Sequence, residues 1–136
     1  MDFDDALTPS GKSYDYKKLE VGKSVQGILQ GKPTVLPHLK YGTNEQEKDG
    51  KGNPKWTLKV TLEIEGEPRS LFLVNSAYWA AIKAFQTAKS SWAEKSEDPM
   101  PFIGGVFGLK REEDGTAKPG FYAPKNYDAK FIPQTQ

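Results

Sequence analysis

Residues 55–64 alternate strictly between polar and apolar side chains. A period of two places successive side chains on opposite faces of a strand, so this stretch predicts a strand with one dry face and one wet face. We expect Trp56, Leu58 and Val60 to point into the core. The side chains expected on the outward face at the start of the same strand are Lys55, Thr57 and Lys59.

A second apolar run, residues 69–74, follows a short turn and predicts the returning strand of a hairpin. A two-residue turn at Glu65 and Gly66 would set Leu71 and Leu73 inward and leave Phe72 outward beside Lys59. A three-residue turn would reverse this parity and set Glu63 opposite Arg69 instead. The sequence leaves both registers open.

The remaining pattern predicts three more strands and one helix. Residues 24–36 indicate one long strand, bent near Gly27 and Gly31, and residues 37–54 indicate a long exposed loop. Apolar residues at helical spacing predict a helix from an N-cap at Asn75 to about Lys89. Residues 90–100 are expected to be its frayed continuation or a linker.

Two further strands are expected towards the C-terminus. Residues 102–109 are apolar on both parities and rich in glycine, which favours a strongly curved strand. Residues 120–132 predict the last strand, with Tyr127, Ala129 and Phe131 on one face and Asp128 and Lys130 on the other.

This order of elements predicts a mainly β chain with the connectivity of an OB-fold, a five-stranded Greek-key barrel with one helix between strands three and four. Another small barrel or an α+β sandwich with the same order is the alternative. We expect a loosely ordered acidic arm at residues 1–20 and a single domain at residues 21–133, with long loops at 37–54 and 112–119. Residues 134–136 would form a short tail.

The composition of the chain excludes several classes of function. A length of 136 residues suits one domain, and the net charge of +1 excludes a basic nucleic-acid tail. With no cysteine and only His38, disulfides, thiol nucleophiles and cysteine-rich zinc sites are excluded. The chain has no apolar run near the roughly 20 residues of a membrane span, and it starts with acidic residues. We therefore expect a soluble, cytoplasmic protein that does not engage membranes.

Some stretches of the chain resemble catalytic or metal-binding motifs but lack residues that these motifs require. Residues 21–24 end like a phosphate-binding loop, but Lys17 stands where that motif requires glycine. Residues 49–53 have too few carboxylates for a calcium loop. No nucleophile and base stand at a recognisable spacing. We expect no enzyme, no cofactor and no metal site.

Beyond these patterns, the chain resembles small bacteriophage OB-fold proteins that bind single-stranded DNA in replication or recombination. The resemblance extends over roughly residues 20–133 and rests on turns and strands. It is carried by residues 52–55 before the alternating strand, the alanine-rich helix 77–85, Gly104 and Gly105, and the turns at 119–121 and 124–127. The C-terminal residues lack the acidic tail by which many bacterial single-strand binders recruit partners. If the chain is phage-encoded, the resemblance implies a place in the host cytoplasm.

A binder of single strands needs cations to follow phosphates and exposed aromatic rings on which bases stack. We expect this binding on the outward face of the hairpin and on the flanking loops. The residues predicted to contact DNA are Lys40, Tyr41, Lys55, Thr57, Lys59, Arg69, Phe72, Lys110, Arg111, Lys118, Phe121, Tyr122 and Lys125. The alternative function is an OB-fold module that engages a replication or host protein through the acidic arm, the long loop and Trp92. Oligomerisation is left open.

Overall fold

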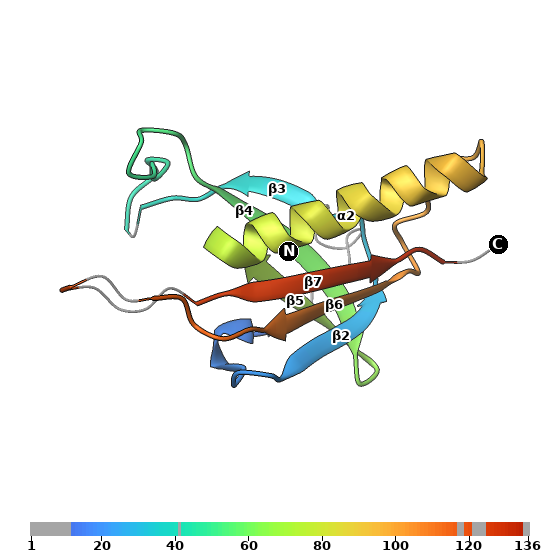
Figure 1. Cartoon of the computed structure of the whole chain (residues 1–136), viewed down its shortest axis with the longest axis horizontal. Coiled ribbons are helices and arrows are strands. Elements are labelled where there is room, and N and C mark those ends of the chain that lie inside the picture. Colours follow the sequence, from blue (N-terminus) through green and yellow to red (C-terminus); the bar gives the residue numbers. More distant parts are fainter. Residues whose placement is uncertain (1–11, 41, 117–118, 121–124, 135–136) are drawn as a thin grey trace, which may run out of the picture.

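Seven strands form one sheet beside one α-helix in residues 12–40, 42–116, 119–120 and 125–134, which the computed structural model describes (Figure 1). The prediction of a mainly β chain with one helix is confirmed. In chain order the elements are β1 (Lys12–Ser13), the 3-10 helix η1 (Tyr16–Lys18), β2 (Ser24–Leu29), β3 (Thr34–Pro37), β4 (Trp56–Ile64), β5 (Glu67–Leu73), α2 (Asn75–Lys95), β6 (Val106–Arg111) and β7 (Tyr127–Ile132).

The sheet is open, with the strand order β1-β5-β4-β2-β6-β7, and β3 also pairs with β4. The strands pair antiparallel except for β1, which runs parallel to β5. Within the described residues the sheet has seven strands and does not close into a barrel, so the expected five-stranded Greek-key barrel stays a prediction. The expected long first strand breaks between Leu29 and Thr34 into β2 and β3, both of which pair with β4. The helix α2 packs mainly against β7, with further contacts to β4 and β5.

A two-residue turn joins β4 to β5. Glu65 and Gly66 both have positive φ angles, 54° and 82°, which is the signature of the tight turn that matches the twist of a hairpin. This turn sets Lys59 opposite Phe72 and buries Leu71 completely. Of the two registers that the sequence leaves open, the structure has the one that points Phe72 outward.

The inward face of β4 packs in the core as its alternation predicts. Leu58, Val60 and Leu62 are at most 1 % exposed. The prediction for Trp56 is wrong, because this residue stands at the open end of the strand and is 38 % exposed. Thr57 has the outward parity, but it is buried, and its Oγ1 lies 3.1 Å from Nδ1 of His38.

The helix α2 is longer than predicted and begins differently. Val74 is its N-cap residue, and Asn75 does not cap the helix but stands in its first turn with a left-handed φ of 52°. Asparagine tolerates this conformation better than most residues. The helix continues past Lys89 to Lys95, and the indole N–H of Trp92 donates to the carbonyl of Asp98 at 2.8 Å. That bond fixes the segment expected to fray.

The expected N-terminal arm is in part built into the fold. Tyr16 is 3 % exposed, and its ring lies edge-on to that of Tyr127 with centroids 5.2 Å apart. The backbone N–H of Tyr14 donates to the carbonyl of Ser70 at 2.8 Å. The packed part of the chain therefore begins before residue 20, while residues 1–11 lie outside the described residues.

Two glycines, Gly27 and Gly105, allow segments of the chain to approach each other closely. A Cβ atom on Gly27 in β2 would overlap the backbone carbonyl of Glu63 in β4, and one on Gly105 would overlap the ring of Phe131. The last strand has the predicted faces, with Phe131 buried and Asp128 exposed. The strand was expected to begin at residue 120, but β7 begins at Tyr127, and residues 121–124 lie outside the described residues.

Candidate nucleic-acid interface

One row of outward side chains crosses three neighbouring strands of the sheet. Thr34 in β3 is the partner of Lys59 in β4, and Lys59 is the partner of Phe72 in β5. Directly opposite residues in antiparallel strands hold their side chains on the same face about 5 Å apart. We call Thr34, Lys59 and Phe72 the outer row.

The outer row offers a ring and a charge together. Phe72 is 41 % exposed, although a large apolar side chain is usually buried when it stands in a strand. Among the described residues, no carboxylate forms a salt bridge with Lys59. An exposed ring beside an unpaired ammonium group is the arrangement that can stack a base and neutralise a phosphate.

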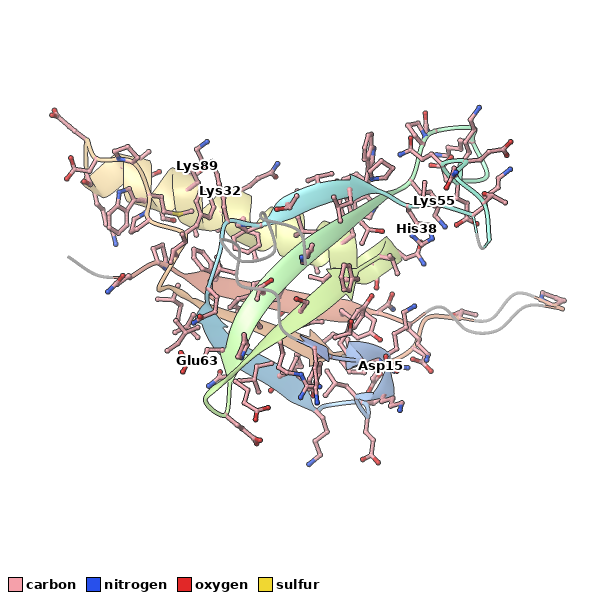
Figure 2. All side chains as sticks on the ribbon, turned by 180° about the vertical axis from the view of Figure 1, so that it is seen from behind. Asp15, Lys32, His38, Lys55, Glu63 and Lys89 are labelled. Carbon is pink, nitrogen blue, oxygen red and sulfur yellow. The ribbon has the colours of Figure 1, made fainter. Side chains whose placement is uncertain are left out.

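Next to this row, the loop after β3 folds back on itself instead of extending freely. The backbone N–H of His38 donates to the carbonyl of Lys55 at 3.0 Å, and that of Glu47 donates to the carbonyl of His38 at 2.7 Å. Nδ1 of His38 lies 3.1 Å from Oγ1 of Thr57, and Nε2 lies 3.0 Å from Oε2 of Glu47. His38 is therefore a link between the loop and the start of β4, where Figure 2 shows it close to Lys55.

The two predicted lysines of this loop are partly neutralised. Nζ of Lys40 lies 3.7 Å from a carboxylate oxygen of Glu45, and Nζ of Lys55 lies 4.0 Å from one of Glu47. Exposed ion pairs of this kind are weak and are screened by salt. Lys40 and Lys55 can therefore exchange these partners for a phosphate. Each would contribute less binding free energy than Lys59, because it first gives up an ion pair.

The tip of the same loop uses a carboxylate for its own geometry. Oδ1 of Asp49 accepts hydrogen bonds from the backbone N–H groups of Lys51 at 2.8 Å and Asn53 at 3.0 Å. These bonds, that of Asn53 above all, lower the pKa of Asp49 below its usual value. Asp49 is thus a turn-forming residue.

The two predicted arginines are engaged within the chain. Arg69 donates to the carbonyl oxygens of Lys12 and Ser13, and it holds β1 against β5. Arg111 is 6 % exposed, and its guanidinium bonds Asp114 and the carbonyl of Leu19. Both arginines come from the inward parity of their strands, and each holds distant segments of the chain together. Their contact with DNA stays a prediction.

The other predicted residues lie apart from the outer row or are not described. Lys110 in β6 lies opposite Ser24 of β2 and Asp128 of β7, on the far side of β2 from the hairpin. Lys125 stands near the start of α2, where its carbonyl accepts from Oγ of Ser76 at 2.7 Å. Four predicted residues lie outside the described residues: Tyr41, Lys118, Phe121 and Tyr122.

Sequence reasoning did not select two residues beside the face. Thr34 was missed because its place opposite Lys59 depends on where the first strand breaks, and the only signal for that break is Pro33. Lys32 lies in the break, with Nζ 6.0 Å from the centre of the Phe102 ring. Neither residue belongs to a motif.

Other kinds of site find no support in the described part of the chain. Its histidine, aspartate and glutamate side chains nowhere gather in a group of three or more that could hold a metal ion. None of its helices has the length and apolar character needed to cross a membrane. In comparisons with known proteins, no family model, curated protein or solved structure matches the chain.

Proposed function

We propose that the chain binds single-stranded DNA, largely without sequence preference, through the outer row Thr34, Lys59 and Phe72. The observation that carries this proposal is the cross-strand pairing of Lys59 with the exposed ring of Phe72. Bases would stack on Phe72 while the ammonium group of Lys59 neutralises an adjacent phosphate. Lys55 and Lys40 would extend the path of the strand towards the loop.

We also infer an OB-fold-like architecture with an open side. The support is the path of the chain: β2 and β3 pair with β4, β4 pairs with β5, the helix follows, and β6 returns to pair with β2 before β7. OB-folds bind oligonucleotides on the face around their second and third strands, which correspond to β4 and β5 here. The resemblance to phage single-strand binders links the proposal to phage DNA replication or recombination.

The test is a titration of a labelled dT oligomer of about 30 nucleotides, followed by fluorescence anisotropy at low and moderate salt. A duplex of the same length is the control ligand. We expect saturable binding that prefers the single strand. The logarithm of the binding constant should fall linearly with the logarithm of the salt concentration. No binding at low salt would reject the proposal and favour the alternative, an OB-fold module that engages a replication or host protein.

A further inference from the structure

A groove of about 970 Å³ runs between α2 and β7, and no residue of the outer row lines it. The helix and the strand lie side by side and run in the same direction (Figure 1). At one end, Oγ of Ser76 in the first turn of α2 donates to the carbonyl of Lys125, just before β7. The groove has two different walls, because one is helical and the other is a strand edge.

The strand wall is open for pairing. Among the described residues β7 pairs only with β6, so half of its backbone N–H and C=O groups point away from the sheet. Such an edge is a template for one more strand. Six residues of β7 are about 20 Å long, which is enough for an added segment of similar length.

The helix wall leaves space at its centre and has aromatic rings near its ends. Ala80, Ala84 and Ala88 line the middle, where their small side chains keep the wall low. Trp79, which is 65 % exposed, and Trp92 also line the groove. Trp92 follows Trp79 by 13 positions, which corresponds to about 20 Å along a helix and matches the length of β7.

The charge of the groove is positive. Lys83 and Lys95 line it from the helix and Lys130 from the strand, against Asp128 as the acidic residue of the lining. Among the described residues none of these three lysines forms a salt bridge. An acidic ligand would therefore meet unpaired cations on both walls.

We propose that this groove binds an extended acidic segment of a partner protein, which adds to β7 as a further strand and places apolar side chains on the helix wall. The occupant must be narrow, because α2 stands beside the open edge. An extended peptide meets that condition, whereas the β7 edge of a second copy would bring its own α2 into the same space.

The experiment uses the full chain and a fluorescein-labelled peptide of ten residues in which aspartate alternates with valine or phenylalanine. We expect saturable binding below about 1 mM peptide, with amide chemical-shift changes concentrated in β7 and α2. The double variant Lys83→Glu/Lys130→Glu should weaken binding at least tenfold. Thr87→Trp, which fills the groove from an exposed position without changing the charge, should weaken it as well.

The matched control is Lys23→Glu/Lys89→Glu, which changes the net charge equally with two exposed lysines that do not line the groove. It should bind the peptide as the parent protein does. A peptide with proline at alternate positions should bind poorly, because it lacks the N–H groups that pair with β7. Thermal melting of each variant verifies that it is folded.

Four results would overturn this proposal. The first is no saturable binding, and the second is equal weakening by the control double variant. The third is competition by oligo-dT together with shifts of the same β7 amides, which would assign the groove to nucleic acid. The fourth is a dimer that Thr87→Trp dissociates, which would assign it to a second copy. DNA affinity is measured separately, so the two proposals can fail independently.

Discussion

The hydroxyl oxygen of Tyr16 accepts a hydrogen bond of 3.1 Å from the backbone N–H of Val74. This N–H belongs to the residue that caps α2, and α2 has no side-chain cap. The bond thus connects the N-terminal part of the described chain with the start of the helix, 58 residues later. It gives the N–H of the N-cap residue a partner that the helix itself does not provide.

Removing that hydroxyl should weaken the fold. Tyr16→Phe leaves the Val74 N–H without its partner, so we expect a loss of about 1 kcal/mol in the free energy of unfolding, measured by urea denaturation. Tyr14→Phe is the control, because the hydroxyl of Tyr14 has no hydrogen-bond partner among the described residues. Equal stability of Tyr16→Phe and the parent protein would contradict the role of the bond.

Alkaline pH should weaken the fold through the same side chain. Burial raises the pKa of Tyr16 from 10.0 to about 12. The folded state therefore favours the neutral phenol, and this contribution is complete below pH 10 and is lost as the pH rises through about 12. Urea denaturation across that range should show a steeper loss of stability for the parent than for Tyr16→Phe. An equal dependence of stability on pH in the two proteins would contradict this role of the Tyr16 phenol.

The outer row predicts how DNA affinity responds to substitution. Lys59→Ala should reduce the slope of log affinity against log salt by about 0.7, the value for one phosphate contact on a single strand. Phe72→Ala should cost about 1–3 kcal/mol of binding free energy, because a stacked base is lost. Anisotropy with oligo-dT measures both.

The control for Lys59→Ala is Lys23→Ala, an exposed lysine on the turn before β2. It removes one charge and should leave the salt slope nearly unchanged. If Lys23→Ala and Lys59→Ala lower the affinity equally, binding depends on the total charge and not on the outer row. If Phe72→Ala binds like the parent, stacking on this ring is excluded.

Glycines in the β2 region should differ in their tolerance of alanine. Gly27→Ala sets a Cβ against the Glu63 carbonyl, so we expect a destabilisation of about 1–3 kcal/mol from overpacking. Gly31→Ala is the matched control, since no atom lies within 4 Å of the Cβ it would add. Its stability should change by less than about 0.5 kcal/mol. Thermal or urea denaturation distinguishes the two, and equal effects would contradict the close approach of β2 to β4.

Local patterns were sufficient to predict most elements of the fold. The alternation in residues 55–64 predicted β4, and alternating faces in residues 127–131 were predicted correctly. The contribution of Tyr16 was not predictable, because a buried tyrosine in a segment without periodicity has no local signal. Closure of the sheet was not predictable either, since it depends on where α2 packs, and that is decided by long-range contacts.

In the candidate site, too, local pattern predicted some features, and others depended on the rest of the structure. Lys59 could be assigned outward from alternation alone, whereas Phe72 depended on the length of a turn that the sequence did not decide. The charge of Arg69 and Arg111 suggested a ligand, but each guanidinium satisfies backbone carbonyls of distant segments. Nothing in the residue type distinguishes an arginine that holds two segments together from one that holds a phosphate.

The open side of the sheet also has a consequence for motion. At that side the ends of the sheet are joined by side chains, such as the contact of Tyr16 with Tyr127, and by the packing of α2. Side-chain contacts break one by one, whereas a hydrogen-bonded ladder opens as a unit. The backbone amides of β7 should therefore exchange with deuterium before those of β4, which is paired on both sides. The molecule would loosen first at this open side, while the β4–β5 hairpin, which carries Lys59 and Phe72, stays rigid.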